Sequence, residues 1–243
     1  MRVILVDTNA TLIEAWRSNL VGLKYVNVFA GSLNKIDPEM VRGTAAVISP
    51  GNSFGYLGGG FDLALRQYFG GHNFENFFKK QLCSIYKPVG TATVVKLGPW
   101  SRNGFKYIIH IPTVVAPAHR IYNADRSLET GYRLVFDAMW NALVHCPRDA
   151  DTLVTSGLGT GYVGVPEAVC SKAMSFAIRL FFANDVMSPE LTRVVIMQFL
   201  GYRFDAFIPA HCLDECFALG IDREALMSYN ADEDPIENIL PQA

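Results

Sequence analysis

A pair of glycine-rich loops constrains this chain most, because each loop follows a strand-like run and opens onto a helical pattern. The first occupies residues 49–62, after the apolar run 45–48, and contains the triplet Gly58, Gly59 and Gly60. The second occupies residues 156–166, after the run 152–155. Glycine is used where the backbone takes a positive φ or comes close to a ligand. Consecutive N–H groups beside a helix start form an anion cradle. Two such loops predict a ligand with two anionic groups.

Strand-like and helical patterns alternate along almost the whole chain, which predicts a layered α/β protein with a mixed sheet. Residues 91–97 and 107–115 are joined by a turn rich in Gly, Pro, Ser and Asn, which indicates an antiparallel hairpin. We expect the remaining strands at 3–6, 25–30, 45–48, 152–155 and 194–200. We expect helices at 12–20, 61–69, 74–85, 127–144, 166–182, 211–219 and 222–228.

Size and charge narrow the functional classes. The chain has 243 residues, half of them hydrophobic, and a formal net charge of −2, so we expect one domain over residues 1–243. No Lys/Arg block occurs, which argues against a nucleic-acid partner. An acidic protein that binds phosphates must rely mainly on backbone donors and helix ends. The acidic tail 231–243 is interrupted by proline and is expected to fray.

Other compositional features predict an intracellular protein, cytoplasmic or nuclear. Five cysteines are an odd number in a chain too long to need disulfides, so we expect reduced thiols. The N-terminus reads as a strand and lacks a signal-peptide cleavage site. No apolar run of ~20 residues occurs, so no membrane span is expected.

Three familiar motifs occur in incomplete form. Residues 51–55 match the serine-hydrolase pattern G-x-S-x-G, but more loop follows Ser53 where the elbow requires a helix. Residues 159–164 match G-x-G-x-x-G, but the acidic residue at about the right spacing, Asp185, precedes the next expected strand instead of ending it. Cys212 and Cys216 lack a second ligand pair for zinc, so buried packing is favoured. His110 reads as a core or strand-end histidine.

Taken together, the two loops resemble the macro domain family. The residues in register with its first motif are Asn52, Ser53, Gly58, Gly59, Gly60 and Asp62, and those in register with its second are Gly159, Thr160, Gly161, Gly164 and Pro166. Residues 107–111 resemble the family's central Y-x-I-H strand. The resemblance spans about residues 25–200, which leaves 1–24 as an N-terminal strand and helix added to the minimal fold. The pattern looks closest to a fungal branch of ADP-ribose 1″-phosphate phosphatases.

This resemblance implies a three-layer α/β/α sandwich that binds ADP-ribose or ADP-ribose 1″-phosphate at the strand ends, without a cofactor or metal. It implies that Asn52 and Asp62 orient the substrate and position the attacking water. The first loop would hold the distal ribose, through Ser53, Gly58, Gly59, Gly60 and Phe61. The second would wrap the diphosphate, through Gly157, Gly159, Thr160, Gly161, Tyr162, Val163 and Gly164.

Four departures from the family pattern bear on function. Ser49 replaces the first Asn of the motif, and Leu57 replaces a His of phosphatase-competent viral relatives. Val163 replaces an aromatic residue, for which its neighbour Tyr162 can compensate. Ser32 replaces the Asp that holds the adenine amino group. Asp7, which ends the added strand, is the candidate substitute, and its alternative role is to cap the following helix.

The leading hypothesis is a metal-independent hydrolase acting at the 1″ end of ADP-ribose, specifically an ADP-ribose 1″-phosphate phosphatase. Water would be activated by Asp62 or by the substrate phosphate; the alternative role of Asp62 is to cap a helix. A non-catalytic ADP-ribose reader and a mono-ADP-ribosyl hydrolase are alternatives that use the same site. Binding of a different nucleotide or of a nucleic-acid end is an alternative of another class.

Overall fold

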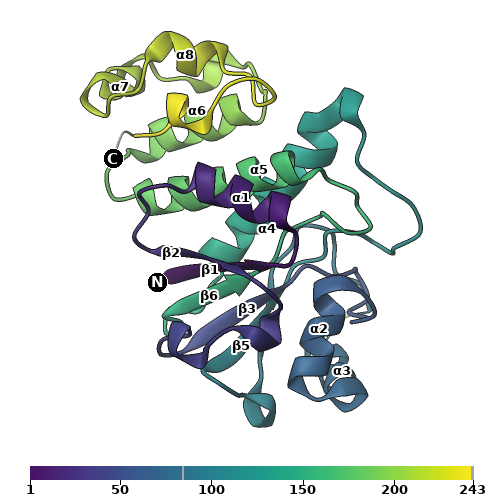
Figure 1. The fold of residues 1–243 in the computed structure, drawn as a ribbon. Helices are drawn as coiled ribbons and strands as arrows, with labels where there is room; N and C mark the ends of the chain where they lie inside the picture. Colours follow the sequence, from purple (N-terminus) through teal and green to yellow (C-terminus); the bar gives the residue numbers. More distant parts are fainter. Residues whose placement is uncertain (84, 242–243) are drawn as a thin grey trace.

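A computed structural model describes residues 1–83 and 85–241 and contains one six-stranded mixed sheet (Figure 1). The strand order is β2-β1-β6-β3-β5-β4. Five strands run parallel and β4 pairs antiparallel with β5 at one edge, which confirms the predicted hairpin. The strands are β1 (Arg2–Asp7), β2 (Val26–Ala30), β3 (Ala45–Ser49), β4 (Thr93–Lys96), β5 (Phe105–His110) and β6 (Thr152–Thr155).

Helices cover both faces of this sheet. The longer ones are α1 (Ala10–Asn19), α2 (Gly60–Phe69), α3 (Gly71–Gln81), α4 (Arg133–Val144), α5 (Glu167–Ala183) and α6 (Pro189–Phe199). Short helices α7 (Glu215–Ala218) and α8 (Arg223–Ser228) follow, and a π-helical turn, Leu128–Tyr132, leads into α4. No described helix combines the length and apolar character needed to cross a membrane.

The alternation of side chains along β1 separates two hydrophobic cores. Val3 and Leu5 pack in a core with α1, α4 and α5, whereas Ile4 and Val6 pack in a core with α2 and α3. Successive residues of a strand point to opposite faces, so an uninterrupted apolar run suits a sheet covered on both sides. The result is the expected three-layer α/β/α sandwich (Figure 1).

The N-terminal strand is an interior strand of the sheet. β1 lies between β2 and β6, with Val3 beside Val26 and Leu153. Residues 1–24, which the resemblance treats as an addition, therefore contribute side chains to the core. The carboxyl end of β1 lies at the same edge of the sheet as those of β6 and β3.

The prediction of a last strand at 194–200 is wrong. These residues belong mainly to α6, which begins at Pro189 and is capped by Ser188, whose Oγ accepts from the Leu191 N–H at 3.1 Å. Val194 and Val195 are β-branched and suggested a strand, but they occupy the buried face of the helix together with Phe199.

The prediction that the tail frays is also wrong for residues 231–241. Ile236, Ile239 and Leu240 are buried, and the Ser127 hydroxyl donates to Asp232 Oδ2 at 2.7 Å. Sparse apolar residues are enough to anchor the segment because α6 and α8 provide a surface to cover. Residues 242–243 lie outside the described residues.

Candidate functional site

The two glycine loops leave neighbouring strands at the same edge of the sheet. β6 lies between β1 and β3, and all three are parallel. Their carboxyl ends therefore place Asp7, the second loop and the first loop side by side. A Cβ atom on Gly59 would lie 3.5 Å from the ring of Tyr162, so the tips of the loops face each other across a short distance.

The first loop is shaped by the side chain of Asn52. Its Oδ1 accepts from the Phe54 N–H at 3.1 Å and the Tyr56 N–H at 3.3 Å, and its Nδ2 donates to the Tyr56 carbonyl at 2.7 Å. The end of this turn is fixed by Leu57, which is buried and donates its N–H to Glu75 Oε1 at 2.9 Å. The Asn52 amide keeps one N–H bond for another acceptor.

A run of unused donors follows this turn. Among the hydrogen bonds of the described residues, none uses the backbone N–H groups of residues 58–62. They lie at the start of the ten-residue helix α2, where the first N–H groups have no partner within the helix. Gly60 has φ +52°, a conformation that favours glycine. The loop therefore presents consecutive free amides and the positive end of a helix dipole.

The second loop has the same property. The Val163 carbonyl accepts from the N–H groups of Ile121 and Tyr122 at 3.1 and 3.0 Å, and the Val165 N–H closes the loop onto the Gly159 carbonyl at 3.0 Å. Within the described part of the chain, the N–H groups of residues 159–163 donate to no acceptor. Gly161 has open space around it. A second row of free amides thus lies on the loop next to the first.

Asp62 lies behind the first row of amides, in a buried polar cluster. Its Oδ1 accepts from the Ser49 hydroxyl at 2.8 Å, and Ser49 Oγ lies 3.2 Å from His110 Nδ1. Burial raises the pKa of Asp62 to about 7, although the hydrogen bond from Ser49 opposes the shift. Burial lowers the pKa of His110 to about 4. A carboxyl group with a pKa near 7 can accept or donate a proton at neutral pH.

Gly51 allows Asp62 to approach this closely. A Cβ atom at position 51 would lie 2.3 Å from Asp62 Oδ2 and 3.3 Å from His110 Cε1. Any larger residue would displace the carboxylate, so this glycine is required by packing.

Asp7 contacts the second loop as well as its own helix. Its Oδ1 accepts from the N–H groups of Thr8 and Asn9 at 2.8 and 3.0 Å, and its Oδ2 accepts from the Gly157 N–H at 3.2 Å. The N-cap of α1 is Asn9. The carboxylate therefore orders the helix start and the second loop together. Ser32 follows β2, the strand beside β1, and its hydroxyl donates to Asn34 Oδ1 at 2.6 Å.

Some predicted ligand contacts can come only from the backbone. Ser53 and Val163 are buried, so their side chains are not presented to a ligand. Ser53 Oγ is also a buried hydroxyl that has no partner among residues 1–83 and 85–241, and loop rather than helix follows it, which excludes the serine-hydrolase elbow. Gly157 is held closely, because a Cβ atom there would lie 2.5 Å from Leu12.

Sequence reasoning named Ser49 only as a departure from the family motif and His110 only as a core or strand-end histidine, and it missed that the two lie together at the site. The two residues are register partners across β3 and β5. The available signal was that each ends a strand, but only the pairing of β3 with β5 places them together.

Metal ligands are not gathered at this site. Within residues 1–83 and 85–241, no three His, Cys, Asp or Glu side chains are grouped so that they could hold a metal ion.

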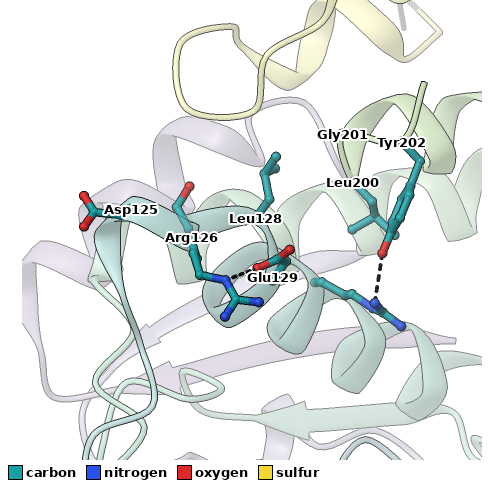
Figure 2. A pocket seen from close by; sticks show the side chains of 9 residues that line it. Asp125, Arg126, Leu128, Glu129, Leu200, Gly201 and Tyr202 are labelled. Carbon is teal, nitrogen blue, oxygen red and sulfur yellow. Dashed lines mark hydrogen bonds and ion pairs between the residues drawn. The ribbon is translucent and has the colours of Figure 1, made fainter.

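A separate pocket of about 290 Å³ lies between the start of α4 and the end of α6 (Figure 2). Three of its four ionic side chains are engaged: Arg126 pairs with Glu129 at 2.5 Å, and Arg133 donates to the Tyr202 hydroxyl at 2.9 Å. We therefore place the functional site at the glycine loops.

A family profile described as "Macro-like domain" matches residues 1–243. An uncharacterized protein of Aquifex aeolicus is 29% identical over 157 residues, which are 64% of this chain and 82% of that protein.

Solved structures with a similar fold are more distant. The macrodomain of Mycobacterium tuberculosis DarG is 18% identical with a TM-score of 0.44, and the match covers 57% of this chain and 84% of that one. The Oceanobacillus iheyensis macrodomain with MES bound is 20% identical with a TM-score of 0.47, covering 59% and 72%. A mutant of the same macrodomain, with ADPR, is 17% identical with a TM-score of 0.44, covering 59% and 73%.

Proposed function

Because the chain belongs to the macro-like domain family, we propose that it binds ADP-ribose derivatives between its two glycine loops and hydrolyses ADP-ribose 1″-phosphate without a metal ion. The observation that carries this proposal is the pair of neighbouring loops with unused backbone amides, at 58–62 and 159–163. A ligand with a diphosphate and a second anionic group at the far ribose matches two separate anion cradles.

The second loop would hold the diphosphate and the first loop the distal ribose with its 1″-phosphate. Backbone donors suit this task in a protein with a net charge of −2, because they attract phosphate without adding basic side chains. Tyr162 is largely exposed and can cover the distal ribose in the place of the family's aromatic residue.

Asp62 would be the general base. Within the described residues Oδ2 accepts no hydrogen bond, it lies against Gly51, and Asp62 as a whole is 6% exposed. As a water oxygen bonds to phosphorus, Asp62 takes the water proton and the bond between phosphorus and the 1″ oxygen breaks. A proton from solvent completes the ADP-ribose product. The free N–H bond of the Asn52 amide would orient the ribose hydroxyls.

Phosphate release from ADP-ribose 1″-phosphate, measured with and without EDTA, tests this proposal. We expect turnover to survive the chelator. Asp62→Asn should lower kcat more than it raises KM, whereas Asn52→Ala should change both. Phe217→Ala is the matched control, because this side chain is 95% exposed and far from the loops in sequence. Loss of activity with EDTA and its recovery with magnesium would rule out the metal-free mechanism.

A non-catalytic reader of ADP-ribose is the second candidate. It is favoured by Leu57, which is fully buried where viral phosphatases have a His, and by Asn52, whose amide is largely used within its own loop. Tight ADP-ribose binding without release of phosphate would select this candidate. Release of ADP-ribose from a mono-ADP-ribosylated peptide would instead select the ADP-ribosyl hydrolase.

Adenine selectivity is assigned to Asp7 within the same proposal. Asp7 stands at the end of β1, beside the Ser32 that departs from the family pattern, and Oδ2 carries only one hydrogen bond, at 3.2 Å. A charge-assisted bond to the adenine amino group would be worth roughly 1.5–3 kcal/mol. The preference for ADP-ribose over its inosine analogue should therefore be lost in Asp7→Ala. An unchanged preference would leave Asp7 as a capping residue only.

A further inference from the structure

Three polar side chains from three elements meet behind the first glycine loop. Ser49 ends β3, His110 ends β5, and Asp62 lies in the first turn of α2; all three are buried. Ser49 Oγ lies 2.8 Å from Asp62 Oδ1 and 3.2 Å from His110 Nδ1. Because Ser49 and His110 are register partners in a parallel strand pair, the sheet itself fixes their separation.

The Ser49 hydroxyl has one proton to share between these two neighbours. An ionised carboxylate can only accept a hydrogen bond, so an ionised Asp62 requires Ser49 to be the donor. Ser49 Oγ can then only accept from His110, which must carry its proton on Nδ1. If His110 were protonated on Nε2, Nδ1 would compete with Asp62 for the Ser49 proton.

The surroundings of His110 favour the Nδ1–H tautomer. His110 Nε2 is fully buried and has no partner among the described residues. A proton on Nδ1 leaves a lone pair unsatisfied at Nε2, whereas a proton on Nε2 would bury an N–H group that has no well-formed hydrogen bond in the described residues. The backbone of Asn52 and of Ser49 also lies near the ring and opposes the lowering of its pKa. Native proteins tolerate unsatisfied acceptors better than unsatisfied N–H donors. Phe78 packs edge-on against the ring, with centroids 5.4 Å apart, which limits its rotation.

Neighbouring charges leave this arrangement in place. Lys87 disfavours a positive charge on His110 and so helps to keep the ring neutral. Two charged side chains of α3 have partners of their own. Glu75 lies 3.4 Å from Arg66 of α2, and the Lys79 ammonium lies over the ring of Tyr56 in the first loop. The pKa of Asp62 is raised by burial and lowered by the hydrogen bond from Ser49.

We propose that Ser49 and His110 are positioning residues for Asp62: the neutral His110 ring, protonated on Nδ1, directs the Ser49 hydroxyl to Asp62 Oδ1 and leaves Oδ2 as the oxygen that faces the ligand. The hydrogen-bond arrangement is independent of the substrate. Its contribution to turnover rests on the proposed function.

The first test is the tautomer of His110, measured by long-range ¹H–¹⁵N NMR on the full chain. The chain has five histidines, and His110→Leu assigns the signal. At pH 8, where Asp62 is mostly ionised, we expect a neutral ring with the proton on Nδ1. Ser49→Ala removes the acceptor of this proton, so the Nδ1–H population should fall. A wild-type ring protonated on Nε2 would overturn the proposal.

The second test is the pKa of Asp62, followed by ¹³C NMR of its carboxyl group and assigned with Asp62→Asn. Ser49→Ala should raise this pKa by roughly one unit, because a hydrogen bond to the ionised form is lost. Ser49→Thr keeps the hydroxyl and should preserve the wild-type value. His110→Asn keeps an N–H donor and should also preserve it, whereas His110→Leu should raise it by less than Ser49→Ala does.

An Asp62 pKa that is the same in wild type and Ser49→Ala would contradict the proposal. Neither NMR test uses a substrate, so the two proposals can fail separately. If the NMR results are as expected but no phosphate is released, the proposed activity is rejected and the hydrogen-bond arrangement of Ser49, His110 and Asp62 stands. If phosphate is released, the acid limb of its pH–rate profile should move to higher pH in Ser49→Ala and not in Ser49→Thr. If the acid limb of the pH–rate profile lies at the wild-type pH in both variants, Ser49 has only a structural role.

Discussion

At the scale of single residues, the buried Asp62 carboxyl group should make the stability of the protein depend on pH. Burial raises its pKa from 3.8 to about 7. Between these values the folded chain holds a proton that the unfolded chain has lost, so the free energy of unfolding falls as pH rises. At 1.36 kcal/mol per pKa unit, this effect reaches up to about 4 kcal/mol above pH 7.

Asp62→Asn removes this titration. The variant should be more stable than wild type at pH 8 and should lose that advantage towards pH 4. His110 acts in the opposite direction, because its lowered pKa of about 4 costs stability as pH falls below 6.5, and this effect should remain in the variant. Urea unfolding of both proteins at pH 4, 6 and 8 measures the difference. A stability difference that does not change with pH would contradict the assignment of Asp62 as the buried titrating group.

At the scale of elements, the first glycine loop contains glycines of two kinds. Gly51 lies against Asp62 Oδ2, whereas Gly58 has open space around it and no positive φ. Gly51→Ala should therefore cost about 1–3 kcal/mol, as overpacking does, and Gly58→Ala should leave the free energy of unfolding nearly unchanged. Thermal unfolding of the two variants compares them directly. Equal effects would mean that the loop does not hold Asp62 as described.

Elements were predictable from the sequence where local pattern and tertiary context agree. The strands at 3–6, 45–48 and 152–155 were predicted because each is a short run of apolar or β-branched residues followed by turn residues. Helix α6 was missed because its β-branched residues favour strands locally, while packing on one face selected a helix. The contact between Ser49 and His110 was missed because it depends on which strands pair, and periodicity does not carry that information.

At the scale of the whole molecule, the C-terminal segment is part of the folded domain. Ile239 is fully buried in the core formed with α4, α5 and α6. Ile239→Ala should destabilise the protein by about 2–5 kcal/mol, the usual cost of truncating a buried aliphatic side chain. Val186→Ala is the control, because that side chain is 59% exposed. If both variants unfold at the wild-type urea concentration, the segment does not contribute to the fold.

The central claim is that the two rows of free amides form one binding site for ADP-ribose, and calorimetric titration of the full chain with ADP-ribose tests it most directly. Gly59→Glu and Gly161→Glu place a carboxylate in each row, at positions without a positive φ and without close contacts, so both variants should fold. Val21→Glu, at a 71% exposed side chain, is the control. We predict that wild type and the control bind ADP-ribose more tightly than AMP or ribose phosphate, and that both glycine variants lose binding. Wild-type affinity in the two folded glycine variants would contradict the claim.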